Sequence, residues 1–192
     1  MNASINEMRE LAYEHLRGGY FEDALEVFSH CLLLEPGDAR IYYGRGMAHL
    51  QLKKWKPAIA DFEKARELDD EDPENCLALA ISLAMDNKIY EAIDCYEALL
   101  ARKPQLVRAH IQIAMLYYRL GVITRGHRQL DIALTFRPSL AERKMIEGLK
   151  KEQLALDKKR FYKPDFEELR RQNQVSSGAF LKKIQNLFIS NG

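Results

Sequence analysis

The sequence lacks the motifs that mark the common classes of enzyme and the long apolar runs that mark membrane proteins. It contains no His-Glu-x-x-His zinc motif, no glycine-rich phosphate loop and no Gly-x-Ser-x-Gly nucleophile motif. No apolar stretch approaches the roughly 20 residues that cross a bilayer, and the first residues lack the basic-then-apolar pattern of a secretory signal. We therefore expect a non-catalytic protein of the cytoplasm that needs no cofactor.

Cysteine is scarce and histidine is scattered, which argues against a metal site. The three cysteines form no Cys-x-x-Cys pair and each falls in a helical pattern, so we expect reduced, buried thiols. His15 and His49 could approach each other, but a third ligand is missing, and packing or hydrogen bonding is their expected role. The acidic run of residues 69–72 lacks the glycine and the distal glutamate of a calcium loop. The sequence predicts no bound metal.

Charge is distributed unevenly along the chain. Residues 1–140 hold 17 Lys and Arg against 21 Asp and Glu, a net charge of −4, whereas residues 141–192 hold 12 against 7, a net charge of +5. The acidic first part and the interrupted basic runs of the second part disfavour nucleic acid as a partner. Lys182 and Lys183 alone attract an anionic membrane too weakly for a membrane role to be expected.

What the sequence does contain is an internal repeat of 34 residues. One column of small residues is followed four residues later by a column of large ones, and the repeat divides residues 5–140 into units 5–38, 39–72, 73–106 and 107–140. The small column is Ala24, Ala58, Ala92 and Gly126; the large column is Phe28, Phe62, Tyr96 and Leu130. Where helices approach closely only glycine or alanine leaves room, and the large residues fill the space beside them.

Each unit reads as two helices separated by a short break. Proline closes three of the units, at Pro36, Pro104 and Pro138, because it has no N–H to donate and opposes a helical residue before it. Ser4 with Glu7 has the Ser-x-x-Glu form of a helix-capping box, and so has the segment that begins at Ser139. The pattern predicts an all-α chain of four helix pairs.

This pattern resembles the tetratricopeptide-repeat family. The family's aromatic residue, glycine and second-helix Ala-x-x-x-Phe appear in the second unit as Tyr42, Gly46, Ala58 and Phe62. The departures are Arg45 for the usual leucine, His15 and His49 for the usual tyrosine, and Leu130 for the usual aromatic residue. The resemblance implies a right-handed α-solenoid whose first helices line a concave groove, the family's usual peptide site.

The positions that the resemblance assigns to the groove are mostly apolar, with a basic rim. Packing between the units is the alternative role for some of these side chains. The groove residues are Tyr13, Tyr43, Met47, Leu77, Ile81, Ile111, Met115 and Tyr118, and the rim residues are Arg40, Arg108 and Arg119.

The composition of the groove distinguishes two kinds of ligand. Family members that bind the C-terminal carboxylates of heat-shock chaperones use a clamp of lysine, asparagine and arginine. The matching positions here are Arg9, Tyr13, Gly44, Glu74 and Ala78 or, one unit later, Tyr43, Met47, Ala78, Arg108 and Gln112. The clamp is essentially absent, so an anionic peptide end would lose charge-assisted hydrogen bonds worth about 1.5–3 kcal/mol each. An apolar extended segment or the apolar face of an amphipathic helix fits better.

Two further segments follow the repeats. Residues 139–162 read as one long helix that caps the last repeat, as the exposed apolar face of a solenoid end requires. Residues 163–192 form an extension with one amphipathic helix, which we expect in the groove of its own chain, in that of a neighbour as a homodimer, on the outside of the solenoid or on a separate partner. The apolar residues of this predicted interaction helix are Phe180, Leu181, Ile184, Leu187 and Phe188.

These features predict a non-catalytic adaptor or scaffold that binds a protein or peptide. Contact between the C-terminal helix and the solenoid, within one chain or between two, is the leading hypothesis. One alternative is a cytosolic chaperone that holds an apolar client segment, as secretion chaperones of this fold do. Another is a regulatory subunit of an enzyme complex whose catalytic chain is separate.

Overall fold

The computed structural model describes residues 4–160, and the side chains up to residue 157. All regular structure in this range is α-helical, which confirms the predicted fold class. The helices are α1 (Ile5–Gly18), α2 (Phe21–Leu34), α3 (Ala39–Gln51), α4 (Trp55–Leu68), α5 (Pro73–Met85), α6 (Ile89–Arg102), α7 (Val107–Arg119), α8 (Ile123–Thr135) and α9 (Leu140–Arg160). The predicted interaction helix with Phe180 and Phe188 lies outside the described residues.

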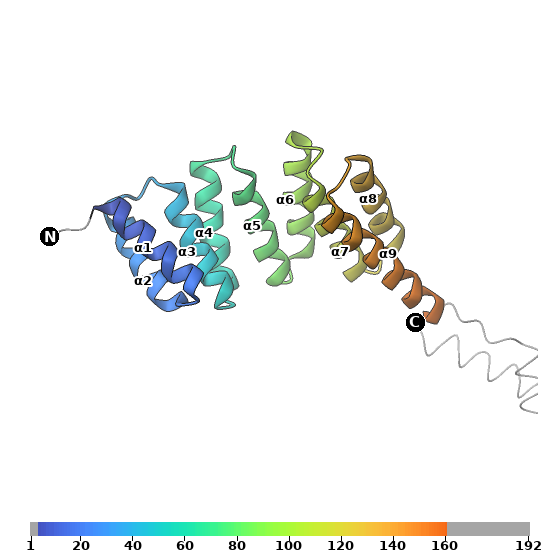
Figure 1. Cartoon of the computed structure of the whole chain (residues 1–192), viewed down its shortest axis with the longest axis horizontal. Helices are drawn as coiled ribbons and strands as arrows, with labels where there is room; N and C mark the ends of the chain where they lie inside the picture. The colour runs from blue at the N-terminus through green and yellow to red at the C-terminus, as the bar shows by residue number, and fades with distance from the viewer. Residues whose placement is uncertain (1–3, 161–192) are drawn as a thin grey trace, which may run out of the picture. The chain divides into compact units, whose positions relative to one another are not determined.

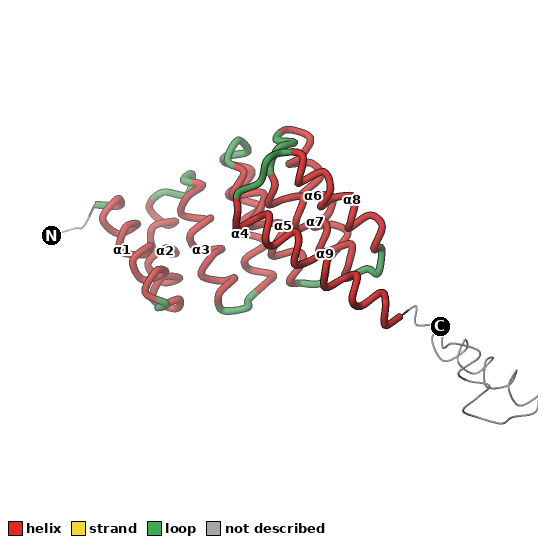
Figure 2. Tube along the Cα trace, turned by 45° about the vertical axis from the view of Figure 1, so that its right-hand side comes forward, coloured by secondary structure: helices red, strands yellow, loops and turns green. Residues whose placement is uncertain are grey.

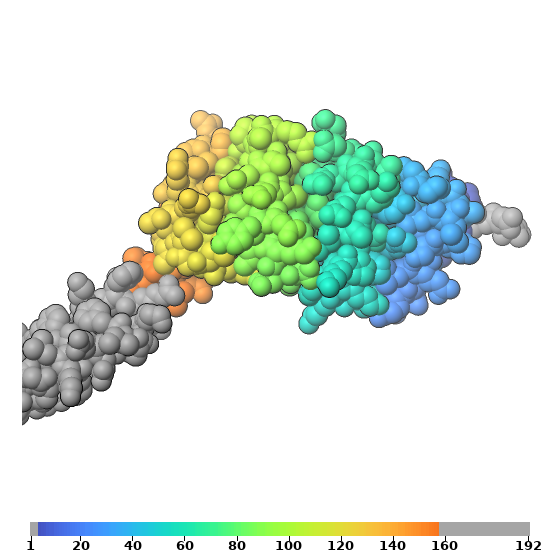
Figure 3. Space-filling view, turned by 180° about the vertical axis from the view of Figure 1, so that it is seen from behind, coloured from blue at the N-terminus to red at the C-terminus, as the bar shows by residue number. Residues whose placement is uncertain are grey.

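The chain divides into two compact units, Met1–Leu149 and Lys150–Gly192, and every helix pair lies in the first. In that unit α1 packs on α2, α3 on α4, α5 on α6 and α7 on α8, and each pair packs on the next (Figure 1). The turns lie alternately at the two ends of the helices (Figure 2). The second helices cover the side seen from behind (Figure 3), so the first helices form the opposite side. This is the stacking of an α-solenoid.

Capping residues explain where the helices begin. The Ser4 Oγ accepts a hydrogen bond from the backbone N–H of Glu7, whose carboxylate accepts one from the Ser4 N–H at 2.7 Å, which is the predicted capping box. Asp38 and Asp72 accept from backbone N–H groups two residues further on, at the starts of α3 and α5. These side chains satisfy N–H groups that have no partner inside the helix.

Close approach of the helices defines the core. A Cβ atom at Gly46 in α3 would lie 2.8 Å from the ring of Phe62 in α4, and one at Gly44 would overlap the ring of Phe28 in α2. Both phenylalanines are fully buried. The aromatic rings therefore lie directly on the backbone of α3, as the alternation of small and large columns predicts.

The predicted capping helix is present as α9. Ile146 in its second turn is fully buried in a cluster with Ile111 and Leu130, and Leu149 packs against that cluster. The helix therefore covers the apolar end of the last pair, which an uncapped solenoid would expose to water.

The three cysteines are free and buried, as expected. Burial raises the pKa of Cys95 to about 11, with a smaller contribution from neighbouring Cys76, so this thiol is unreactive at neutral pH. Among the described residues we find no helix with the length and apolarity that a membrane crossing requires.

The turn inside each pair places one residue in the left-handed region of backbone conformation. These residues lie 34 positions apart: Gly19, Lys53, Asn87 and Gly121, with φ between 57° and 82°. Glycine adopts this conformation without penalty and asparagine with a small one, but a lysine is strained by about 1–2 kcal/mol. The turn between α3 and α4 therefore contains a residue, Lys53, in an unfavourable backbone conformation.

We expect Lys53→Gly to stabilise the protein by about 0.5–1 kcal/mol, because relief of the strain exceeds the extra entropy of the unfolded chain. Urea unfolding measures the change. Lys54→Gly is the matched control, since Lys54 has a φ of −88° and gains nothing from glycine. A Lys53→Gly variant no more stable than the parent would contradict the strain.

Candidate protein-interaction face

The outward surface of α1, α3, α5 and α7 is the predicted binding surface, and we call it the first-helix face. Of the eight predicted apolar groove residues, Leu77 and Ile111 are each only 2% exposed. The prediction that these two line an open surface is wrong, because Leu77 packs in the central core and Ile111 in the cluster that includes Ile146 of α9. The other six are half-buried.

Two of the half-buried tyrosines also hold the fold together. The Tyr13 ring lies edge-on to Phe28 at 5.1 Å, and its hydroxyl donates to the backbone carbonyl of Arg40 at 2.7 Å, which ties α1 to α3. Burial raises the pKa of Tyr13 to about 12, and the charges of Tyr43 and Asp38 add to the shift, so the hydroxyl stays protonated as a donor. Tyr43 lies edge-on to Phe62 at 5.7 Å.

Tyr118 packs within its own helix pair. Its ring occupies the space that a Cβ at Gly126 in α8 would need, and its hydroxyl shares a 3.3 Å hydrogen bond with His127 Nδ1. Replacement of Tyr118 would therefore disturb the fold as well as a binding surface.

The remaining apolar residues form one row along the first-helix face. Met47, Ile81 and Met115 occupy the same repeat position as Tyr13, at intervals of 34 residues, and all three are half-buried. We call Tyr13, Met47, Ile81 and Met115 the apolar row. Methionine is flexible and polarisable, so such a row can adjust to ligands of different shape.

The three rim arginines are engaged inside the chain. Arg40 makes a bidentate pair with Asp38, Arg108 pairs with Glu74 at 3.0 Å, and Arg119 donates to the backbone carbonyl of Ala84 at 3.1 Å. The guanidinium groups of Arg40 and Arg108 remain more than half exposed. Their positive charge is largely balanced by neighbouring carboxylates, which the sequence did not reveal.

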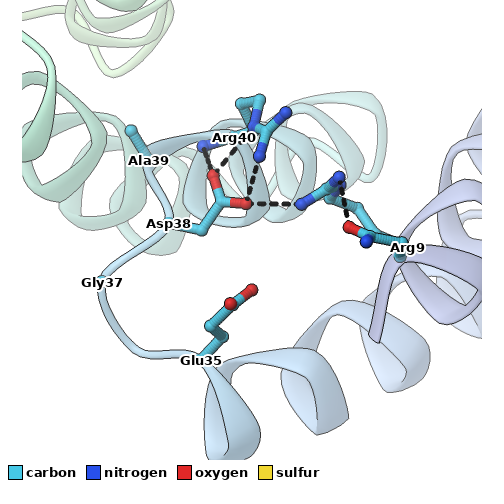
Figure 4. Close-up of a pocket in the computed structure, with 7 residues that line it drawn as sticks. Arg9, Glu35, Gly37, Asp38, Ala39 and Arg40 are labelled. Carbon is cyan, nitrogen blue, oxygen red and sulfur yellow. Dashed lines mark hydrogen bonds and ion pairs between the residues drawn. The ribbon is translucent and has the colours of Figure 1, made fainter. Parts of the chain in front are cut away.

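A polar pocket lies at the start of the first-helix face (Figure 4). Its volume is about 380 Å³. Asp38 lies at its centre and accepts a hydrogen bond from Arg9 Nη1 at 2.6 Å, while Arg9 Nη2 donates to Asn6 Oδ1 at 2.9 Å. The lining residues are Asn6, Arg9, Glu35, Gly37, Asp38, Ala39 and Arg40.

The charges in this pocket are matched. Burial works to raise the pKa of Asp38, but the hydrogen bonds and charge of Arg40 and the charge of Arg9 outweigh it and hold that pKa below its usual range. Asp38 is thus a carboxylate at neutral pH, and Arg9 is nearly buried against it.

Comparison with known proteins identifies the repeats. A family model described as tetratricopeptide repeat matches residues 39–72, the segment of α3 and α4. The crystal structure of MamA has a TM-score of 0.66 at 22% identity, over 70% of this chain and 78% of that one. Residues 39–72 are a tetratricopeptide repeat (TPR), and the helix pairs have the fold of a TPR solenoid. The second TPR domain of human RPAP3, solved by NMR in complex with the HSP70 peptide SGPTIEEVD, has a TM-score of 0.54 at 20% identity, over 57% of this chain and 91% of that one.

Curated relatives share a short segment. Sperm-associated antigen 1 of mouse is 32% identical over 91 residues, which are 47% of this chain and 10% of that protein. Serine/threonine-protein phosphatase 5 of mouse is 30% identical over 99 residues, which are 51% of this chain and 20% of the phosphatase. The chain thus spans a tenth to a fifth of these relatives, and the matches show a common TPR segment.

The pocket residue Arg9 lies at one of the positions that form the carboxylate clamp in the TPR proteins that bind heat-shock chaperones. Here its partner is Asp38 of the same chain, so the pocket already holds a carboxylate. An anionic peptide end would have to displace Asp38, which also caps α3. The structure therefore adds a second obstacle to the missing clamp residues.

The unusual residues of the second TPR form a polar cluster between its two helices. Arg45, in place of the usual leucine, makes a bidentate pair with Asp61 of α4 at 2.6 and 3.0 Å. His49, in place of the usual tyrosine, has its Nε2 at 3.8 Å from Asp61, and its buried Nδ1 has no hydrogen-bond partner within the described residues. Asp61, which the sequence did not single out, is the buried counterpart of both departures.

His49 makes stability depend on pH. Burial lowers the pKa of His49, Asp61 partly opposes the shift, and Arg45 and Lys54 add to the lowering. The unfolded chain, with an ordinary histidine pKa of about 6.5, then binds a proton before the folded chain does. The folded state therefore loses stability as the pH falls below about 6.5.

We expect the stability advantage of the parent over His49→Gln to shrink as the pH falls through this range, because glutamine takes up no proton. Urea unfolding across the pH series measures both proteins. His30→Gln, at an exposed histidine on α2, is the matched control. If the difference between the parent and His49→Gln is independent of pH, the lowered pKa is contradicted.

Proposed function

We propose that this TPR protein is a non-catalytic adaptor that binds an apolar protein segment along its first-helix face. The observation that carries the proposal is the apolar row of Tyr13, Met47, Ile81 and Met115, which is half-buried and crosses all four helix pairs. An extended peptide or one face of an amphipathic helix would cover such a row.

The charges around the row support an apolar ligand over an anionic one. Arg40, Arg108 and Arg9 all have carboxylate partners within the chain. A ligand carboxylate gains little from cations that are already paired. The HSP70 peptide bound by the second TPR domain of RPAP3 ends in an acidic sequence, and we do not expect it to bind here.

The same surface would serve the two alternatives, a chaperone for an apolar client segment and a regulatory subunit of an enzyme complex. Coexpression separates them, because a chaperone raises the solubility of its client, whereas a subunit is recovered in a stable complex with its enzyme. A cytoplasmic location is part of the proposal for each.

We expect Met47→Gln combined with Met115→Gln to weaken binding of the natural partner at least tenfold. Glutamine keeps the side-chain length but places a polar amide on the row, and a tenfold loss corresponds to about 1.4 kcal/mol. Affinity purification with mass spectrometry identifies the partner, and calorimetry with the purified partner measures the change.

Ala60→Glu is the matched control for these substitutions, because Ala60 is exposed on α4, away from the apolar row. The SGPTIEEVD peptide tests the carboxylate mode directly. Unchanged partner affinity in the double glutamine variant, or tight binding of that peptide, would refute the proposed surface.

The occupant of the first-helix face can also come from this protein. We propose that the predicted interaction helix of the extension binds the first-helix face of its own chain or of a neighbour in a homodimer. Its apolar residues are Phe180, Leu181, Ile184, Leu187 and Phe188. Deletion of residues 165–192 is expected either to halve the mass measured by light scattering or to increase peptide binding at unchanged mass. Unchanged mass together with unchanged peptide binding would exclude both forms.

A further inference from the structure

Helix α1 has one face, distinct from the first-helix face, that no other helix among residues 4–160 covers. In α3, α5 and α7 the corresponding face is largely buried, with Ile41, Leu79 and Ile113 at most 2% exposed. α1 carries Glu7 at the position of Ile41, and Leu11 at the position of Leu79 and Ile113. Glu14 lies about one turn further along the same face of α1. All three are exposed, with Leu11 at 45%. In the other pairs this face of the first helix is part of the core. In α1 it is instead a surface with one exposed leucine among carboxylates.

The two ends of the repeat array have opposite charge. Residues 5–38 carry eight carboxylates against two arginines, a net charge of −6, while residues 107–140 carry five arginines against one aspartate, a net charge of +4. The whole chain has a net charge of only +1, so positive and negative charges are separated along the chain and nearly cancel in total. Two copies of this chain therefore attract each other most strongly when the first pair of one faces the last pair of the other.

The basic end has exposed cations that make no ion pair with the described part of the chain. Arg125 and Arg128 are exposed on α8, and neither makes an ion pair within the described residues. Arg125 lies over the ring of Tyr117 at 5.7 Å, which holds its guanidinium in place. Phe136, just beyond α8, is 37% exposed and offers an apolar contact. This surface thus matches that of α1 in both charge and apolar content.

We propose that the outer face of α1, with Glu10, Leu11 and Glu14, docks on the Arg125 and Arg128 surface of α8 in a second copy of the chain. The two surfaces lie at opposite ends of the row of helix pairs (Figure 1), so each copy uses both in contacts with different neighbours. Such a head-to-tail contact is heterologous, and it builds open chains of molecules when the rotation does not close a ring.

The contact depends on ionic strength because its charges are exposed. Light scattering or sedimentation is expected to show a mass that rises with protein concentration in about 10 mM salt, where the Debye length is about 30 Å. The mass should return to that of the 22.3 kDa monomer in about 1 M salt, where the Debye length is about 3 Å.

Charge reversal tests the two surfaces separately. Glu10→Lys with Glu14→Lys replaces the carboxylates of the α1 docking face by cations, and Arg125→Glu with Arg128→Glu replaces the cations of the α8 docking face by carboxylates. Each variant then has like charges on its two docking faces, so each alone is expected to remain monomeric in low salt. Mixed in equal amounts, the two variants present opposite charges at every contact and are expected to assemble again. Circular dichroism confirms that each variant is folded.

Glu63→Lys with Glu97→Lys is the matched control, because it makes the same change in net charge at exposed residues of α4 and α6. We expect this control to assemble like the parent. A parent that is monomeric at every concentration in low salt overturns the proposal. Assembly of either end variant alone, or failure of the two folded variants to assemble when mixed, also overturns it.

Discussion

The structure depends on the close approach of neighbouring helices, where an aromatic ring lies directly on a glycine. Phe28 fills the space beside Gly44 in the next pair, and Phe62 fills the space beside Gly46 in its own pair. Because interiors pack as densely as organic crystals, a helix held in this way cannot rotate without opening a cavity or forcing an overlap. The rotation of each first helix, and with it the set of side chains that turn outward, follows from these contacts.

Polar contacts between successive pairs also hold the helices in place, but they contribute less to stability than the packing does. Arg9 reaches Asp38, Arg102 reaches Asp70 and Arg108 reaches Glu74, each over about one repeat length. The last two pairs are exposed, so water screens their charges and they contribute little to stability. Their main effect is on the surface, because they balance the rim charges and leave the apolar row as its distinctive feature.

The sequence predicts the helix pairs well because a 34-residue period, small-residue columns and capping residues are all local signals. It predicts less well which way a residue faces. Ile111 and Leu77 have the same repeat position as Tyr43, yet they are buried, since their exposure depends on the helices packed around them. The pairing of Arg45 with Asp61 was missed for the same reason, because it depends on the rotation of α4 against α3.

The distribution of polar and apolar groups separates two kinds of contact on one molecule. An apolar row gives affinity through burial, which salt hardly weakens. The outer face of α1 has carboxylates around a single leucine, so apolar stacking of a further helix is disfavoured there, as at the polar terminal repeats that solenoids need for solubility. What remains at that end is electrostatic attraction, which is weak for each pair, sensitive to salt and therefore easily reversed. An apolar row along the first-helix face and charged surfaces at the ends would let the array bind an apolar partner and associate reversibly through different surfaces.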